Sequence, residues 1–157
     1  MMSNTLLESV VKKNRARLIP FMLALYVLAF LDRSNIGFAK ETYQLDTGLS
    51  NEAYALGAGI FFVVYAFLWV PANLLMRKFG ARRWIGCTTL LWGVLSAAMA
   101  WADTEAKFLL VRTLLGAAEA GFFPGMIYLT SQWFPQQNRA SIMGLFYMGA
   151  PLALTLG

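Results

Sequence analysis

The 157-residue sequence contains no histidine and a single cysteine, Cys87. Without histidine, the chain has neither a histidine proton relay nor the usual zinc ligands, so any proton chemistry has to use carboxylates. A single cysteine excludes an internal disulfide. The sequence also lacks a recognisable motif that would bring a nucleophile or metal ligands to the carboxylates. We therefore expect no catalytic residue, no metal site and no cofactor, and the protein is not expected to be an enzyme.

Charged residues are scarce as well. They make up 13% of the chain, whereas hydrophobic residues make up 59% and the mean hydropathy is +0.57. This composition excludes a disordered chain and lies far above that of an ordinary soluble domain. We therefore predict an all-α membrane protein. Its five apolar segments, each about as long as a membrane-spanning helix, cover residues 18–39, 52–76, 84–102, 107–130 and 140–157.

The basic residues gather on one side of the expected spans. If residues 1–17 form a cytoplasmic tail, the alternating loops place nine basic residues inside and two, Lys40 and Lys107, outside. This strong bias follows the positive-inside rule and predicts a cytoplasmic N-terminus. It also accounts for most of the net charge of +5, so no nucleic-acid partner is expected. The nine residues are Lys12, Lys13, Arg15, Arg17, Arg77, Lys78, Arg82, Arg83 and Arg139.

Two opposite charges, Arg112 and Glu119, lie inside the fourth apolar segment. Seven residues make two near-complete helical turns, so both side chains project from one face, roughly 10 Å apart along the axis. At that separation they cannot neutralise each other directly. Each costs about 2.5 to 3.5 kcal/mol at the bilayer centre, and such residues normally face a bundle interior or an aqueous cavity. We therefore expect partners on another helix.

The first span carries a second pair of charges, Asp32 and Arg33. Neighbours in a helix point ~100° apart, so these two side chains cannot aim at one spot. Pairing across helices, with Arg33 near Glu119 and Asp32 near Arg112 or solvent, would offset the cost of burial. A purely structural salt-bridge network is the alternative to a functional cavity, although intramembrane ionisable residues usually mark function.

Proline and glycine predict local departures from regular packing. Pro71, Pro124 and Pro151 each remove an amide donor inside or near the end of a span, so we expect kinks or unwound turns there. Gly116 and Gly121 would let a neighbouring backbone come close to the fourth span.

The loop between the second and third spans carries a recognisable motif. It resembles the G-x-x-x-D-[RK]-x-G-x-[RK]-[RK] signature of the major facilitator superfamily. With Asn73 and Arg77 at the glycine and acidic positions, it is similar to the variant found in one branch, the anion:cation symporter family. The whole loop reads Asn73-Leu-Leu-Met-Arg77-Lys78-Phe-Gly80-Ala-Arg82-Arg83, and the matching residues are Lys78, Gly80, Arg82 and Arg83.

Two further motifs are similar to the same branch, and the resemblance runs along all 157 residues. It implies the N-terminal six-helix bundle of a carrier that has two such bundles, with the binding site at their interface. Residues 18–157 would supply about five helices of that bundle. The missing sixth helix and C-terminal half would be needed for transport, so we expect an N-terminal fragment. The two motifs are Arg112-x-x-x-Gly116-x-x-Glu119-x-Gly121-x-x-Pro124 and Asp32-Arg33-x-Asn35.

The resemblance also implies roles for individual residues. Arg33 and Arg112 would bind the substrate carboxylate, and Tyr65 would contact the hydroxyls of the substrate. Asp32 and Glu119 would take up protons. The conformational loop motif would consist of Lys78, Gly80, Arg82 and Arg83.

Within the branch, the chain is most similar to bacterial sugar-acid carriers, in the stretches that begin at Tyr26 and Gln132. The implied function is import of a sugar acid such as L-rhamnonate across the bacterial inner membrane, with the proton as coupling ion. A different organic anion, such as a hexuronate, galactonate, tartrate or an aromatic acid, remains an alternative. So does a membrane anion sensor or assembly partner that does not transport. The expected partners are a small carboxylate and the lipid bilayer.

Overall fold

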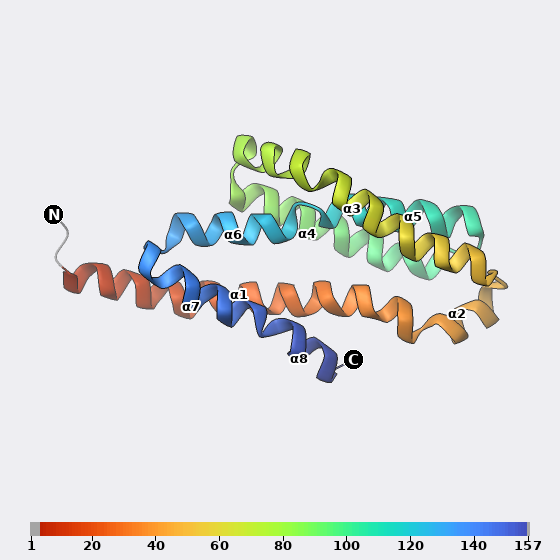
Figure 1. The fold of residues 1–157 in the computed structure, drawn as a ribbon, viewed down its shortest axis with the longest axis horizontal. Helices are drawn as coiled ribbons and strands as arrows, with labels where there is room; N and C mark the ends of the chain where they lie inside the picture. The colour runs from red at the N-terminus through yellow and green to blue at the C-terminus, as the bar shows by residue number, and fades with distance from the viewer. Residues whose placement is uncertain (1–3, 157) are drawn as a thin grey trace. The chain divides into compact units, whose positions relative to one another are not determined.

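Helices account for almost all of the chain in the computed structural model, which describes residues 4–156 (Figure 1). These residues contain no strand, which confirms the all-α prediction. In chain order the elements are α1 (Asn4–Phe38), α2 (Lys40–Thr47), α3 (Asn51–Phe79), α4 (Ala81–Ala98), the 3-10 helix η1 (Met99–Trp101), α5 (Glu105–Glu119), α6 (Phe122–Trp133), α7 (Gln136–Tyr147) and α8 (Gly149–Leu156).

By length and composition, four segments of the described chain could cross a membrane, and they overlap the first four predicted spans. The fifth predicted span, 140–157, falls on α7 and α8, which Met148 separates and which have 12 and 8 residues. Residue 157 lies outside the described residues, and a fifth span stays a prediction. The four segments are Glu8–Phe38, Asn51–Phe79, Ala81–Trp101 and Glu105–Trp133.

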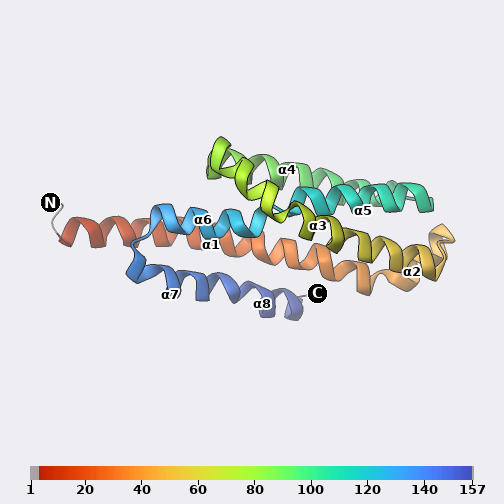
Figure 2. The ribbon, with the colours of Figure 1, turned by 45° about the horizontal axis from the view of Figure 1, so that its top comes forward.

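The chain divides into two compact units. Unit 1 comprises Met1–Ser34 and Met126–Gly157, and unit 2 comprises Asn35–Gly125. In unit 1, α7 and α8 run along α1 (Figures 1 and 2). The ring centroids of Tyr26 on α1 and Phe146 on α7 are 4.4 Å apart, and Gly149 packs against Tyr26. Buried α1 residues recur every three or four positions, as expected for one helical face: Met22, Leu25 and Ala29.

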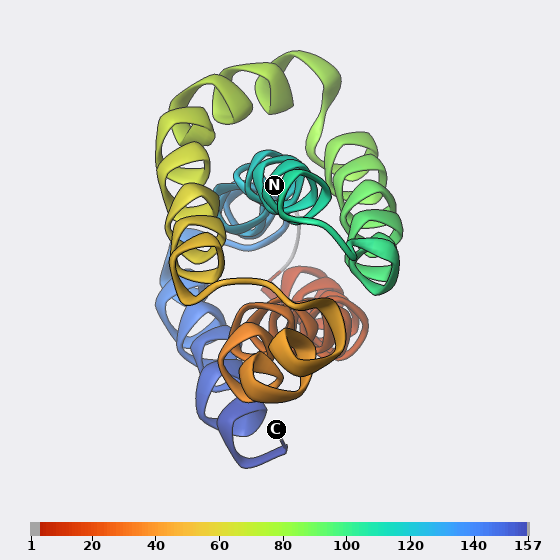
Figure 3. The ribbon, with the colours of Figure 1, turned by 90° about the vertical axis from the view of Figure 1, so that its right-hand side faces the viewer.

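In unit 2, α5 lies between α3 and α4 (Figure 3). Two glycines bring the backbones of α3 and α5 together. A Cβ at Gly116 would lie 2.5 Å from the carbonyl oxygen of Phe61, and a Cβ at Gly57 would overlap the ring of Phe108. In the most apolar window of the segment that contains α5, 61% of the residues are buried, compared with at most 22% in the other three segments. The segment that carries the two charges is therefore the one with the most buried residues.

In unit 2, an aromatic cluster joins α2, α3 and α5. The ring of Phe108 lies 5.3 Å from that of Tyr54 and 5.7 Å from that of Tyr43. The hydroxyl of Tyr43 donates to the carbonyl of Ala102 at 2.6 Å, and that of Tyr54 donates to the carbonyl of Ile36. Burial, with nearby Tyr54, raises the pKa of Tyr43 above its ordinary value, so its hydroxyl stays a donor at neutral pH.

The fourth span consists of two helices, because α5 ends at Glu119 and α6 begins at Phe122. Pro124 has no N–H to donate to the carbonyl four residues earlier, so this interruption confirms the local break predicted from Pro124. A Cβ at Gly121 would overlap the indole of Trp84, which shows how closely α4 approaches the break. By contrast, α3 continues without interruption through Pro71, so no turn is unwound there.

The contact between Gly116 and Phe61 leads to a first prediction. Gly116→Ala should destabilise the full chain by about 1 to 3 kcal/mol, because the new methyl group would collide with a backbone carbonyl that cannot easily move. The matched control is Gly93→Ala in α4, where a Cβ has nothing within 4 Å. Thermal unfolding of purified protein in detergent should show a lower midpoint for the first variant only. Equal midpoints for the two variants would contradict the close helix contact.

Candidate functional site

Arg112 lies on α5 with only 2% of its surface exposed. Its Nε donates a hydrogen bond to the carbonyl oxygen of Gly57 on α3, at 3.2 Å. Its guanidinium carbon lies 4.5 Å from the centroid of the Phe61 ring. A cation over an aromatic face is stabilised by about 0.5 to 2 kcal/mol, more when water is excluded. The buried charge of Arg112 is therefore stabilised partly by the carbonyl dipole of Gly57 and partly by the ring of Phe61.

Helix α3 presents these two contacts one turn apart. Gly57 and Phe61 are four residues apart, so they share one face of α3. A helical carbonyl has a second lone pair in addition to the one used by the helix itself, and a glycine leaves no side chain to shield it. Arg112 can therefore reach the backbone of α3 without interrupting that helix. The spacing of Gly57 and Phe61 is visible in the sequence, but their relation to Arg112 depends on how α3 and α5 pair.

Glu119 is the last residue of α5 and is 1% exposed. Arg112 and Glu119 are therefore both buried on the one helix, as their spacing predicts. The C-terminal end of a helix carries a partial negative charge, so a carboxylate there is electrostatically unfavourable. Helix stability does not explain why an acidic residue lies at this position. Within residues 4–156, no three acidic or cysteine side chains come together in a way that could hold a metal ion.

Tyr65 belongs to an aromatic column on α3. Its ring stacks on that of Phe61, with centroids 6.0 Å apart and planes at 19°, and meets the ring of Trp69 edge to face at 5.4 Å. Trp69 in turn lies 5.9 Å from Phe123, at the start of α6. The column therefore leads from the guanidinium of Arg112 towards the break after Glu119. Sequence reasoning identified Tyr65 alone, although the spacing of four residues could have identified Phe61 and Trp69.

Asp32 and Arg33 lie on α1 in unit 1, and both are half-buried. The helix is continuous through them, so their side chains point in different directions around its axis, as predicted. The pairing of Arg33 with Glu119 and of Asp32 with Arg112 stays a prediction, as do the roles in carboxylate binding and proton uptake.

The loop motif lies where α3 ends and α4 begins. Gly80 has φ +83° and ψ 141°, a conformation that favours glycine, and its N–H donates to the carbonyl of Met76. Lys78 in the last turn of α3 favourably faces the negative end of that helix, whereas Arg82 and Arg83 in the first turn of α4 face a positive end. All three are exposed, and their role in conformational change stays a prediction.

Comparisons with known proteins identify the family and the fold of this chain. The family model described as Major Facilitator Superfamily matches residues 22–157. The inner membrane transport protein RhmT of Escherichia coli strain K12 is 90% identical over 156 residues, which cover 99% of this chain and 36% of that protein. A putative tartrate transporter of Agrobacterium vitis is 47% identical over 155 residues, covering 99% of this chain and 34% of that protein.

One solved structure has the same fold. It is a bacterial homologue of the human lysosomal transporter Spinster, in an inward-facing and occupied conformation. The match has a TM-score of 0.83 at 21% identity and covers 88% of this chain and 30% of that chain. This chain thus spans about a third of the length of the proteins it matches. From the family match and the identity to RhmT, the chain belongs to the Major Facilitator Superfamily.

Proposed function

We propose that this chain forms the N-terminal part of a proton-coupled symporter that imports a sugar acid such as L-rhamnonate across the bacterial inner membrane. The observation that carries the proposal is the burial of Arg112 and Glu119 on one helix of an apolar spanning segment. Ionisable residues at such depth mark substrate and proton pathways. The names of the two relatives, an inner membrane transport protein and a putative tartrate transporter, support transport of an anionic hydroxy acid.

Arg112 is suited to hold the substrate carboxylate. A guanidinium remains charged throughout a transport cycle and can bind a carboxylate through two parallel hydrogen bonds. The hydrogen bond from Nε to Gly57 and the Phe61 ring beneath the guanidinium fix the plane of that group. Fixing the plane beforehand lowers the entropy lost when the substrate binds. Arg33 on α1 supplies the second arginine of the proposed site.

Tyr65 supplies a hydroxyl one helical turn from Phe61, on the face of α3 that meets Arg112. A sugar acid has a carboxylate at one end and hydroxyls along its chain, so an arginine followed by a tyrosine matches the order of its groups. Tyr65 is half-buried and held between Phe61 and Trp69. The aromatic faces of this column would contact the C–H groups of the substrate.

Asp32 and Glu119 couple the proton to the substrate. Two arginines and two carboxylates leave the empty site close to neutral, so an arriving substrate carboxylate competes with Asp32 or Glu119 for a guanidinium. Protonation of the protein carboxylate removes this competition and also the cost of burying its charge. Substrate and proton therefore favour each other's binding, which is the thermodynamic requirement for symport.

Replacing Glu119 with glutamine should abolish accumulation driven by a pH gradient but preserve substrate exchange. E119Q keeps the shape of the side chain but cannot release a proton, so accumulation driven by a pH gradient should fall to the level of liposomes without protein. Exchange of labelled for unlabelled L-rhamnonate, which needs no net proton movement, should persist. Both are measured in proteoliposomes with the complete carrier, including the C-terminal half that this chain does not supply. The matched control is E105Q, the same change at an exposed carboxylate of α5, which should retain both activities. Gradient-driven uptake by E119Q at the normal rate would refute the proton role.

Replacing Arg112 with lysine should weaken binding while keeping the charge. R112K loses the Nε–H bond to Gly57 and the planar fork, so the Kd for L-rhamnonate should rise by about 10- to 100-fold. Titration calorimetry on the complete carrier measures this change, with Arg82→Lys, at an exposed arginine, as control. L-rhamnose, which has no carboxylate, should not bind. An unchanged Kd in R112K would remove Arg112 from the site.

A panel of organic anions tests the substrate class. L-rhamnonate, galactonate and tartrate are compared for uptake under one pH gradient, and the proposal requires L-rhamnonate to be taken up with the highest kcat/KM. Preference for another anion would keep the carboxylate site but change its substrate. Tight binding of these anions without any flux would instead identify a membrane anion sensor.

A further inference from the structure

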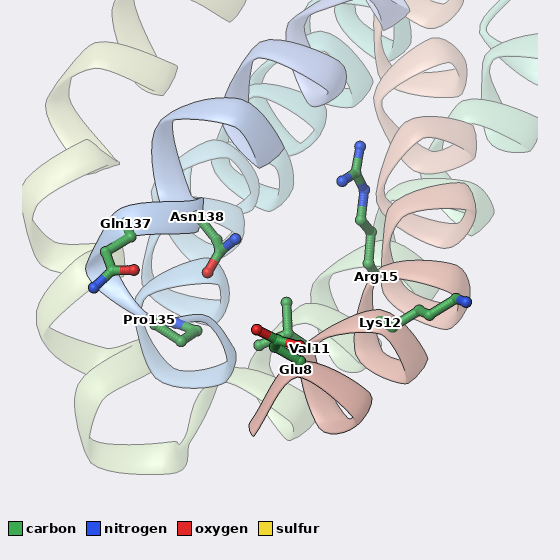
Figure 4. Close-up of a pocket in the computed structure, with 7 residues that line it drawn as sticks. All are labelled: Glu8, Val11, Lys12, Arg15, Pro135, Gln137 and Asn138. Carbon is green, nitrogen blue, oxygen red and sulfur yellow. The ribbon is translucent and has the colours of Figure 1, made fainter. Parts of the chain in front are cut away.

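A cavity of about 540 Å³ lies in unit 1, between the N-terminal part of α1 and a wall formed by Pro135 and the first turn of α7 (Figure 4). None of its residues belongs to the candidate site described above. On the α1 side it is lined by Glu8, Val11, Lys12 and Arg15, and on the other side by Pro135, Gln137 and Asn138.

Arg139, which does not line the cavity, stabilises the wall formed by Pro135, Gln137 and Asn138. Its Nη2 donates to the carbonyl of Ser131 at 2.7 Å, and its Nε donates to the carbonyl of Phe134 at 3.0 Å. The side chain of Phe134 is buried, and the N–H of Asn138 donates to the carbonyl of Pro135. The path of residues 134–138 is therefore fixed by hydrogen bonds, and the cavity wall is preformed.

The chemistry of the lining suits a singly charged phosphate group. Lys12 and Arg15 contribute two positive charges, and Glu8 contributes one negative charge, which leaves a net charge of +1. Lys12 and Arg15 are three residues apart and so are neighbours on the helix surface. In Figure 4, Asn138 points from the first turn of α7 towards α1, and Arg15 extends between α1 and α7, while the side chain of Lys12 points away from Asn138. Arginine binds phosphate oxygens in pairs, and an amide nitrogen adds a further donor.

Both walls lie at the level of lipid headgroups, on two independent grounds. Lys12 and Arg15 come six and three residues before Leu18, where the apolar run begins, so they lie roughly 9 and 4.5 Å outside it along the helix. The headgroup layer on each side of the hydrocarbon core is about 5 to 8 Å thick. On the other wall, Trp133 ends α6 with 53% of its surface exposed, two residues before Pro135. Tryptophan concentrates at the membrane–water interface.

We propose that this cavity binds the phosphodiester group of an anionic phospholipid, on the side of the membrane predicted to be cytoplasmic. Arg15 holds the phosphate oxygens, Lys12 adds a second positive charge from the exposed surface of α1, and the side-chain amide of Asn138 donates to one of the oxygens. The carboxylate of Glu8 accepts a hydrogen bond from a headgroup hydroxyl such as those of phosphatidylglycerol. The net charge of −1 on that lipid matches the +1 of the cavity, whereas phosphatidylethanolamine has no net charge to match it.

Native mass spectrometry of the purified full chain, titrated with single lipids, tests this site. The wild type should bind phosphatidylglycerol more tightly than phosphatidylethanolamine. The double variant K12Q/R15Q should lower the affinity for phosphatidylglycerol by about 10- to 30-fold, the effect of two basic residues near a lipid phosphate. The matched control K13Q/R17Q removes the same two charges from the same helix, at exposed positions outside the cavity, and should change the affinity little. N138L should weaken binding without any change in charge.

Three results would overturn the proposal. Equal losses in K12Q/R15Q and K13Q/R17Q would mean a general attraction of the basic helix to anionic lipid, with no defined site. Equal binding of phosphatidylethanolamine would remove the selectivity for an anionic headgroup. Competition by inorganic phosphate at the concentration at which phosphatidylglycerol binds would make free phosphate, not a lipid, the ligand. Because lipid binding is measured directly, the outcome does not depend on the proposed transport activity.

Discussion

The packing of unit 2 depends on stabilising the positive charge of Arg112, which is buried inside an apolar spanning segment. Burying a guanidinium without partners would cost several kcal/mol, and the Gly57 carbonyl and the Phe61 ring help to offset this cost. Both partners are useful only if α3 and α5 approach closely. That approach in turn requires a glycine at position 116, where a methyl group would meet the Phe61 carbonyl. The same few residues therefore allow the close packing of α3 and α5 and stabilise the buried charge of Arg112.

The two buried charges of α5 differ in how far stability accounts for them. Arg112 is held by groups of α3, and its removal would also disturb the packing around Phe61. Glu119 lies at the end of α5, where the helix dipole disfavours a carboxylate, so that dipole does not explain its position. This difference is one reason why proton uptake is proposed for Glu119 and carboxylate binding for Arg112.

The parts of this structure that follow local rules could be predicted from the sequence. Hydropathy predicted the all-α class and the first four spans, and Pro124 predicted the interruption between α5 and α6. The contact of the Phe61 ring with Arg112 could not be predicted, because a cation–π contact depends on which helices pair and in which register. Likewise, the bond from Tyr43 to Ala102 joins residues far apart in the chain. Hydropathy cannot locate a helix end inside an apolar run, and at the separation of α7 from α8 it was Pro151, three residues after Met148, that predicted a local break.

The break between Glu119 and Phe122 has a mechanical consequence for the fourth span. In a continuous helix, bending at any point strains hydrogen bonds on one side of the axis. Here the bond from residue 124 to the carbonyl of Ala120 cannot exist, because proline has no N–H. The break therefore has one backbone hydrogen bond fewer than a continuous helix, and the N–H of Gly125 still donates to the carbonyl of Gly121 at 3.1 Å. The break in the fourth span begins one residue after Glu119. A change in the angle between α5 and α6 would therefore alter the surroundings of Glu119 more than those of Arg112, which lies seven residues earlier.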